Sequence, residues 1–393
     1  MSGLIKGQVI NLLKCLRQQH GYNITLICIW QPWVQILQKA KINEMKNELS
    51  ESGIELENYP LAILPSRYFM YDYRTLPLLM GYLTIAFRFL NLKRFDLIHS
   101  RSYVPSYIVA KLNSEKFYKC IFDMRSLLPE EYVTVGKWSL GSPTYRLWKK
   151  YEKYAVNNSE AFIAVSQEMK EQADNIIDGK NADLVYLMVN MQRLQYDESI
   201  RLKVRAQNSL VDKFVIVYTG SLGFDWLWNN IHNYAVYYEK MKIVYDNLFF
   251  VFIVPEILNG FNSVLKKHGI AQNEYLFVQG DSEIAKWFSA ADAGIHVMSN
   301  GPESHTRFGV KVVEYLANGL SVVTNSGVGA AASFVEANGV GFRLDLDDQF
   351  NKKFYEFVNN SGDRKKKIEI ANSLFSVESA SKKYAKIYER VLN

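Results

Sequence analysis

The stretch RFGVKVVEYLANGL, residues 307–320, is expected to form a helix with an unusual charge distribution. At about 100° per residue, its polar residues fall on one narrow face and its apolar residues occupy the remainder. These polar residues are Arg307, Lys311, Glu314 and Asn318. A surface helix normally has a wide polar face and a narrower apolar one. The pattern therefore predicts a mostly buried helix with a thin polar stripe.

The charges on such a helix must be paired or must bind something. Two cations, a carboxylate and an amide suit a nucleoside diphosphate. Cations neutralise phosphate, a carboxylate accepts from ribose hydroxyls, and backbone N–H groups at a helix start bind anions. The alternative is an internal ion pair between Lys311 and Glu314, three residues apart, covered by neighbouring structure.

The segment after this helix carries a second nucleotide signal. Residues 320–325 are an expected strand that leads into GVGAAA (327–332), a G-x-G-x-x-A string. Asp345 then stands near the place of the ribose acid in a dinucleotide-binding fold. However, only about two helical turns fit before Gly339, and the string comes late in its domain. We interpret it as a turn that closes the back of a ligand site, not as an NAD fingerprint.

Short apolar runs alternate with helical patterns along the whole chain. The expected strands are residues 24–30, 95–100, 119–126, 160–166, 183–190, 214–220, 248–254, 274–280, 292–298 and 320–325. This alternation predicts an α/β protein with two doubly wound, Rossmann-like domains. Ligands in such architectures favour the C-terminal strand ends and the interdomain cleft.

The expected domains are residues 1–195 and 205–375, joined by a polar stretch, with a C-terminal helix over 376–393 that crosses back to the first domain. An α/β domain would normally have a strand before the glycines at 3–7. Its absence predicts a start upstream of Met1 or a sheet that lacks its first strand.

Composition narrows the function classes. The chain has 393 residues, more than one core usually holds. Its net charge of +6 suits an anionic ligand or membrane surface, but no Lys/Arg block is dense enough to indicate nucleic-acid binding. Three cysteines without metal-ligand spacing predict a reduced cytosolic protein. The D-x-D at 345–347 is expected to be a solvated loop and no metal site.

The apolar segment LPLLMGYLTIAFRFL (76–90) is too short to span a bilayer, which needs about 18 residues. We expect a buried crossover helix of the first domain. The alternative is an interfacial helix beside a lipid-linked acceptor, because basic residues flank the segment. The expected location is cytoplasmic, with a peripheral contact on the inner face of the membrane as the extension of that alternative.

Residues 306–323 resemble the signature of retaining glycosyltransferases of family 4, which have the GT-B fold. The matching residues are Phe308, Gly309, Glu314, Ala317, Gly319, Val322 and Val323. The departing residues are Thr306, Tyr315 and Ser321, which replace a Glu, an Ala and a Pro. Lys311 through Ala317 also match a Lys-x-x-Glu-Tyr-Leu-Ala variant among relatives that lack the first Glu. Thr306 leaves the identity of the donor sugar open.

The resemblance extends over nearly the whole chain. The similar segments are residues 3–7, FDLIHSRSY (95–103), IAVSQEM (163–169), VYTGSLG (217–223) and FVQGDSEIAKWFSAADAGI (277–295). Each is weak alone, but their order and spacing are specific. The resemblance implies a donor site in the second domain and an acceptor site in the first. The implied donor-binding residues are Gly3, Gly7, Gly220, Ser221, Gly280, Arg307, Phe308, Gly309, Lys311 and Glu314.

Three residues are expected to act in catalysis: Arg125, Lys311 and Glu314. Glu314 is implied to hold the donor ribose, and Lys311 the diphosphate. Arg125 occupies the place of a histidine found in many relatives, where it would stabilise the departing diphosphate or orient an anionic acceptor. The alternative for Arg125 is a salt bridge with Asp123, Glu130 or Glu131. His99, at another strand end, is expected to be a satisfied core histidine.

The implied activity is retaining, metal-independent transfer of a hexosyl group from a nucleoside diphosphate sugar to a saccharide or lipid-linked acceptor, in cell-surface polysaccharide synthesis. Such a reaction needs no dedicated base, because the leaving phosphate takes the acceptor proton, but it needs stabilisation of that phosphate. No cofactor beyond the donor is expected. The alternatives are a nucleotide-sugar epimerase of the same fold, a catalytically silent nucleotide-sugar-binding protein, and an NAD-dependent oxidoreductase.

Overall fold

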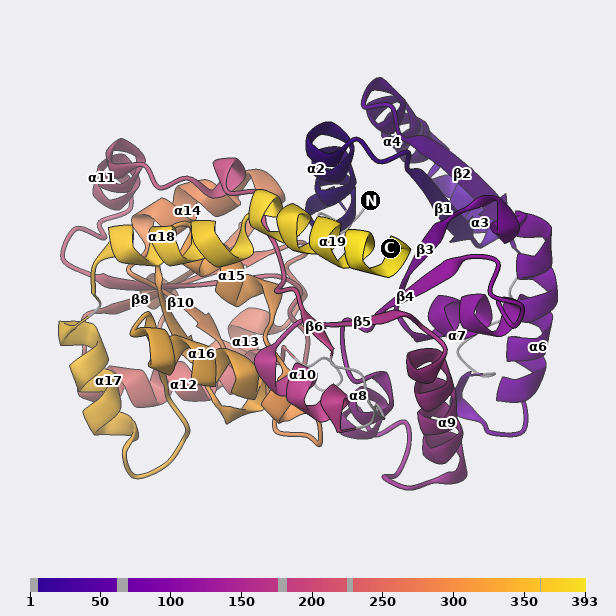
Figure 1. Cartoon of the computed structure of the whole chain (residues 1–393). Coiled ribbons are helices and arrows are strands. Elements are labelled where there is room, and N and C mark those ends of the chain that lie inside the picture. Colours follow the sequence, from indigo (N-terminus) through magenta and orange to yellow (C-terminus); the bar gives the residue numbers. More distant parts are fainter. Residues whose placement is uncertain (1–5, 62–69, 176–181, 225–228, 361) are drawn as a thin grey trace. The chain divides into compact units, whose positions relative to one another are not determined.

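A computed structural model describes residues 6–61, 70–175, 182–224, 229–360 and 362–393 of the chain. The chain forms two compact units (Figure 1). The first unit comprises Met1–Tyr186 and Val377–Asn393, and the second comprises Leu187–Ser376. The second unit thus begins ahead of the connection expected at 195–205, and the C-terminal helix belongs to the first unit.

The first unit contains two parallel sheets among its described residues. Its strands are β1 (Thr25–Trp30), β2 (Glu55–Pro60), β3 (Leu97–Arg101), β4 (Lys119–Asp123), β5 (Ala161–Ala164) and β6 (Asp183–Leu184). Its helices are α2 (Asn11–His20), α3 (Pro32–Leu37), α4 (Lys39–Glu51), α6 (Leu76–Phe87), α7 (Tyr103–Leu112), α8 (Leu128–Thr134), α9 (Pro143–Asn157), α10 (Gln167–Asp174) and α19 (Val377–Leu392).

Strands β3, β4, β5 and β6 form one sheet in that order, and β1 pairs with β2 in the other. Strand β2 was not predicted, because ELENYP is mostly polar and only Leu56 of it is buried. The expected strand at 183–190 is wrong beyond Leu184, where pairing ends.

The second unit is built around one six-stranded sheet. Its strands are β7 (Phe214–Thr219), β8 (Leu248–Val254), β9 (Tyr275–Gln279), β10 (Ala293–His296), β11 (Ser321–Thr324) and β12 (Gly341–Arg343). Its helices are α11 (Glu198–Gln207), α12 (Ile231–Val244), α13 (Phe261–Lys267), α14 (Ile284–Ala290), α15 (Val310–Ala317), α16 (Gly329–Asn338), α17 (Phe350–Asn359) and α18 (Arg364–Phe375).

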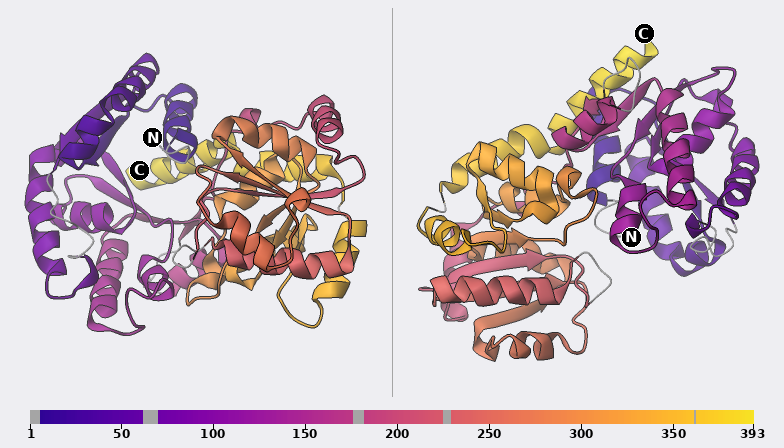
Figure 2. Two further views of the ribbon diagram at one scale, coloured as in Figure 1. Left: turned by 180° about the vertical axis from the view of Figure 1, so that it is seen from behind. Right: turned by 90° about the horizontal axis from the view of Figure 1, so that it is seen from below.

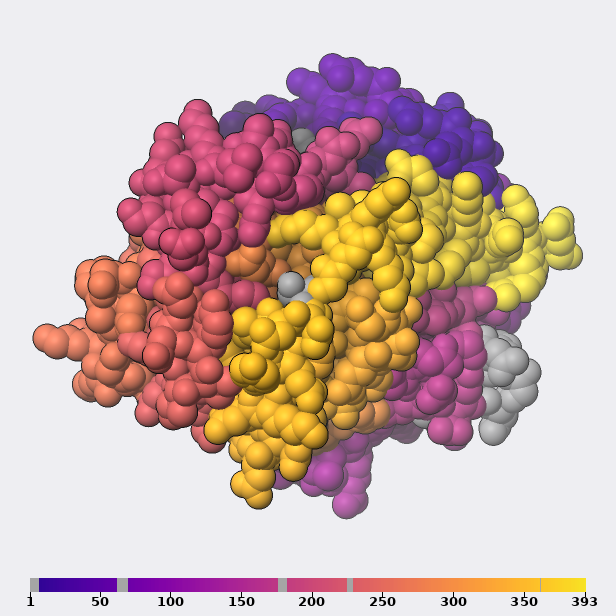
Figure 3. Space-filling model, turned by 90° about the vertical axis from the view of Figure 1, so that its left-hand side faces the viewer, coloured from indigo at the N-terminus to yellow at the C-terminus, as the bar shows by residue number. Residues whose placement is uncertain are grey.

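The strand order of this sheet is β12-β11-β10-β7-β8-β9, and every pair is parallel. Helices cover both faces of it (Figures 1 and 2). Strands β7, β10 and β11 are buried along their whole length, as expected for a parallel sheet covered on both sides. On the outside, Figure 3 shows α11 in pink and the α17–α18 segment in yellow. The predicted α/β fold with parallel sheets in two domains is confirmed.

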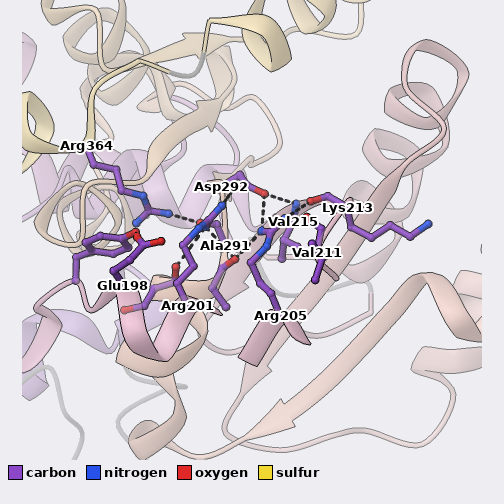
Figure 4. A network of polar contacts seen from close by, with 12 residues as sticks. Glu198, Arg201, Arg205, Val211, Lys213, Val215, Ala291, Asp292 and Arg364 are labelled. Carbon is purple, nitrogen blue, oxygen red and sulfur yellow. Dashed lines mark hydrogen bonds and ion pairs between the residues drawn. The ribbon is translucent and has the colours of Figure 1, made fainter. Parts of the chain in front are cut away.

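A network of arginines closes the N-terminal edge of this sheet (Figure 4). Asp292, which precedes β10, accepts hydrogen bonds from Arg201 (2.6 Å), Arg205 (3.0 Å) and the backbone N–H of Val215 (2.8 Å). Both guanidinium groups also donate to backbone carbonyls, among them that of Ala290. Because its donors find acceptors in the protein, the network is structural.

Helix α15 is fixed to the C-terminal part of the sheet by Tyr315. Its ring lies over Gly294 of β10, where a Cβ would come within 2.3 Å of the ring. The phenol donates to the carbonyl of Ile295 (3.0 Å) and accepts from the N–H of Thr219 (3.2 Å). The absence of a side chain at Gly294 therefore permits the close approach of α15 to β7 and β10.

Replacing Gly294 with alanine should push Tyr315 away from the sheet. Overpacking of this kind lowers the free energy of unfolding by about 1–3 kcal/mol, so the melting temperature should fall by several degrees. Gly81→Ala is the matched control: a Cβ there meets nothing within 4 Å. Its position inside α6 predicts a gain of about 0.5–1 kcal/mol. Equal melting temperatures for the two variants would contradict this account of the packing.

Candidate functional site

Lys311 and Glu314 lie on α15, at the C-terminal edge of the six-stranded sheet of the second unit, and both are half-buried. The predicted helix over 307–320 is too long at both ends. It begins at Val310, because Gly309 has a φ of 76° and interrupts any earlier turn. Arg307 is therefore not part of the polar stripe.

The side chain of Lys311 crosses Gly220, the residue that follows β7. A Cβ at Gly220 would lie 2.6 Å from Cε and 3.1 Å from Nζ of Lys311, so this glycine makes room for the lysine. The ammonium group lies 5.6 Å from the ring centroid of Tyr218. It makes no hydrogen bond or ion pair with any residue that the structure describes. Burial lowers the pKa of Lys311 to about 8, although Glu314 acts in the opposite direction.

Glu314 is also without a hydrogen-bond or ion-pair partner in the described part of the chain. Burial raises the pKa of its carboxyl to about 7, while Lys311 and Arg193 act to lower it and Asp281 to raise it. Arg193 and Asp281 themselves form an exposed ion pair of 3.7 Å. The internal Lys311–Glu314 ion pair, which the sequence left as an alternative, is not formed within 4.0 Å. Two opposite charges thus stand side by side with their hydrogen-bonding capacity unused.

His296 completes the described surroundings of Lys311, and the sequence reasoning missed it. It is the last residue of β10, it is buried, and a Cβ at Gly309 would lie 2.6 Å from its Nε2. Its Nδ1 has no partner. Burial, Lys311 and Arg307 hold its pKa well below the usual value, so the imidazole is neutral. The only sequence signal was its position at the end of an expected strand.

Arg307 has a different environment from Lys311. Its guanidinium pairs with Glu303 (Nε to Oε1, 3.0 Å) and donates to the carbonyls of Ser299 (2.7 Å) and Gly327 (2.9 Å). Arg307 therefore ties the loop before α15 to the start of the Gly327 segment, and several of its donors are already used. Its binding of phosphate stays a prediction.

The glycine string at 327–332 is explained by close contacts of its backbone. A Cβ at Gly327 would lie 1.9 Å from the carbonyl oxygen of Met298, and Gly329 starts α16. Asp345 accepts from the N–H (2.8 Å) and hydroxyl (2.7 Å) of Ser326. These bonds bind Asp345 to the turn that carries the glycines.

The remaining residues predicted for the donor site lie in several places. Gly220 and Gly280 follow β7 and β9 with positive φ angles, and the carbonyl of Ser221 accepts from Tyr218. Phe308 is buried against two other phenylalanine rings. Gly7 lies in a helical turn, Lys6–Ile10, in the first unit, and Gly3 lies outside the described residues. Thus Gly220, Gly309, Lys311 and Glu314 are brought together.

Arg125 lies in the first unit, just past β4. Its guanidinium lies 3.4 Å from a carboxylate oxygen of Asp123. Asp123 is one of the three salt-bridge partners that the sequence suggested for Arg125. The same carboxylate lies 3.5 Å from Nε2 of His99, whose Nδ1 is 2.7 Å from the hydroxyl of Tyr388. His99 is thus a core histidine with partners, as expected. Burial alone would raise the pKa of Asp123, but Arg125, His99 and Arg101 lower it to about 2.

One family model matches most of the first unit. Residues 8–193 match the family model described as Glycosyltransferase Family 4. Comparison with curated protein sequences gives no match.

Three solved structures are similar over nearly the full chain. Sucrose-phosphate synthase from Thermosynechococcus elongatus is 14% identical with a TM-score of 0.67, covering 94% of this chain and 99% of that chain. HepE from Anabaena, in complex with UDP and glucose, is 14% identical with a TM-score of 0.64, covering 94% and 100%. A glycosyltransferase from Rickettsia africae is 16% identical with a TM-score of 0.64, covering 100% and 97%.

The chain has the GT-B glycosyltransferase fold. The resemblance to this class, stated from the sequence, is confirmed for the fold over both units, and residues 8–193 match the family 4 model. In this chain, Lys311 and Glu314 lie at the carboxyl ends of the strands. Parallel α/β domains usually bind their ligands at that edge of the sheet.

The geometry of the pair makes a prediction about the titration of Lys311. Burial lowers the pKa of both Lys311 and Lys367 to about 8. After reductive ¹³C-methylation, two dimethyl-lysine resonances should therefore titrate near pH 8, and one of them should be missing in Lys311→Arg. In Glu314→Gln the pKa of Lys311 should fall further, because the carboxylate that favours the ammonium form is removed. A matched change at the exposed Glu356 should leave it unaltered. An ordinary lysine pKa for Lys311 would contradict its burial.

Proposed function

We propose that the protein is a retaining glycosyltransferase that binds a nucleoside diphosphate sugar in its second unit. The observation that carries this proposal is the half-buried pair of Lys311 and Glu314, neither of which has a hydrogen-bond partner among the described residues. A buried charge without a protein partner is costly, and a ligand offsets that cost. HepE, which has the same fold, is described in complex with UDP and with UDP-glucose.

The two side chains match the two halves of such a donor. Lys311, at the second residue of α15, would bind the diphosphate together with the free N–H groups of the first helical turn. Glu314, one turn further along the same helix, would accept hydrogen bonds from the ribose hydroxyls. Gly220 gives both the lysine and the diphosphate close access to the loop after β7.

The proposed chemistry follows from these roles. The bond between the anomeric carbon and the diphosphate breaks, and the acceptor hydroxyl forms the new bond on the same face of the sugar. The hydroxyl proton passes to the leaving diphosphate, whose charge Lys311 stabilises. Neither a metal ion nor a further cofactor takes part in this scheme. The proposed acceptor is a saccharide or a lipid-linked saccharide of cell-surface polysaccharide synthesis.

Binding of donor provides the test. UDP-, GDP- and ADP-sugars should be compared by thermal shift, calorimetry and release of free nucleotide. At least one should stabilise the wild type, and Glu314→Gln and Lys311→Met should weaken its binding by about 10- to 100-fold, the loss expected for one charge-assisted hydrogen bond. Affinity should be highest between about pH 7 and 8, where the carboxylate and the ammonium coexist.

Glu356→Gln, an exposed change in the same unit, is the matched control and should bind as the wild type does. Stabilisation by NAD and by no nucleotide sugar would overturn the proposal. Binding without turnover, with saccharide acceptors supplied, would favour the catalytically silent alternative, and epimerised free sugar nucleotide would favour the epimerase.

We further propose that α6 rests on an anionic membrane surface, as a lipid-linked acceptor would require. No helix in the described residues is long and apolar enough to cross a bilayer. One side of α6 is buried, as predicted for a crossover helix, but Leu78, Ile85 and Phe89 on its outer side and extension are 60–81% exposed. The exposed cations Arg88 and Lys93 lie in the same segment. Apolar side chains with flanking cations suit an anionic interface.

Vesicle flotation tests this contact. The triple variant L78S/I85S/F89S should lose most of its binding to vesicles with anionic lipid, because it removes the apolar anchor. The control L202S/V211S/I243S removes three side chains of the second unit that are 62–75% exposed, and it should float as the wild type does. Absence of wild-type binding to these vesicles, or equal loss in both variants, would refute the docking of α6.

A further inference from the structure

The C-terminal edge of the four-stranded sheet in the first unit carries more positive than negative charge. Arg101 ends β3, and Arg125 follows β4. Both guanidinium groups approach the buried carboxylate of Asp123, at 3.8 Å and 3.4 Å. Two guanidinium groups against one carboxylate leave at least one positive charge without a counter-charge. Burial lowers the pKa of Arg101, and so does electrostatic repulsion from the neighbouring Arg125.

Within the described part of the chain, the hydrogen bonds of the two arginines leave most of their N–H donors unused. Arg125 donates to Asp123 and to Oε1 of Gln8, and Arg101 donates to the same Gln8 oxygen at 3.3 Å. A guanidinium group has five N–H donors. No backbone carbonyl of the described residues accepts from either side chain, because both arginines donate only to Asp123 or Gln8 there.

The arginine network of the second unit shows how a purely structural cluster differs. There, too, two arginines share one aspartate, Asp292 (Figure 4). However, Arg201 and Arg205 each also donate to several backbone carbonyls, and the cluster lies at the N-terminal edge of its sheet. The cluster of the first unit lies at the ligand-binding edge and lacks those acceptors.

Gln8 gives a second, independent indication of a ligand. It is only 3% exposed, and its Nε2 has no hydrogen-bond partner. Because its Oε1 accepts from both arginines, this unused amide lies at the same place as their spare donors. A buried amide without a partner is costly. Donors from three side chains, with no acceptor to satisfy them, are what an oxyanion requires.

Docking of the C-terminal helix accounts for only part of this cluster. Tyr384 of α19 donates to Asp123 (3.5 Å) and Tyr388 contacts His99 (2.7 Å), so these bonds attach α19 to β3 and β4. They use Asp123 and His99 and leave the arginines unsatisfied. Arg125 also has a left-handed backbone, with φ of 69°, which costs energy for a non-glycine residue and is common at functional sites.

We propose that Arg101, Arg125 and Gln8 together bind an oxyanion, a phosphate or carboxylate group carried by the acceptor. This deepens the proposed function, because it makes the acceptor an acidic saccharide or a phosphorylated one. The site belongs to the first unit alone and does not involve Lys311 or Glu314. Each guanidinium would place two parallel N–H groups on the anion, and the Gln8 amide would supply one more.

The test uses the full chain and two probes, inorganic phosphate and glucuronate, measured by calorimetry in the Lys311→Met background so that the second unit does not contribute. One of the probes should bind, and Arg101→Gln and Arg125→Gln should each weaken it by about tenfold or more. Gln8→Leu should weaken it by a few-fold. Arg101 is the safer variant for folding, because its side chain is 35% exposed. Preference for phosphate or for glucuronate identifies the group on the acceptor.

Arg201→Gln is the matched control, since it removes an arginine from the other aspartate-centred cluster; it should lower the melting temperature and leave anion affinity unchanged. The proposed anion site would be refuted if the wild type bound neither probe. It would also be refuted if the Arg101 and Arg125 variants bound the probe as tightly as the wild type does. Donor binding is read separately from UDP-sugar titration of the Arg101→Gln protein. This titration is made with Lys311 intact: if that protein binds donor but no anion, both proposals stand, whereas a wild type that binds an anion but no nucleotide sugar sinks only the proposed function.

Discussion

The contact of the Tyr315 ring with Gly294 is the constraint on which the second unit depends. A glycine in the middle of a buried strand leaves a gap, and the ring fills it, so that α15 lies close against β7 and β10. The phenol then bonds one backbone group on each strand. Because the helix cannot rotate on the sheet, Lys311 and Glu314 are held in place at its carboxyl edge. The tyrosine that departs from the family pattern is therefore the anchor of the site.

Both units concentrate charge at strand ends, but what that charge does depends on its acceptors. At the start of β10, Asp292 pairs with two arginines and a backbone N–H, and both arginines also donate to backbone carbonyls, which stabilises the fold. At the carboxyl ends of the strands, Lys311 in one unit and the Arg101–Arg125 pair in the other have N–H donors that no described residue accepts. The number of spare donors, more than the number of charges, separates a ligand site from a structural network.

Much of the fold and the Lys311–Glu314 pair could be predicted from the sequence, and the predictions that were wrong have physical causes. The spacing of Lys311 and Glu314 was read from helical periodicity, which holds for any helix. The start of that helix was not predicted, because the sequence does not show that Gly309 takes a positive φ or that His296 lies against it in the folded chain. The contacts of Arg307 with Ser299 and Gly327 were not predicted either, because only the folded loops bring these partners to it.

The sequence by itself determined the alternation of strands and helices, the parallel sheets, and the pair of residues on α15, because these follow from local periodicity and the chemistry of a few side chains. Only the tertiary structure decided which charges have partners. Gln8, Arg101 and Arg125 are far apart in the chain, and no local pattern predicts that the two arginines approach Asp123 and donate to Gln8. Whether a buried donor is satisfied depends on groups from distant segments, and folding alone brings those together.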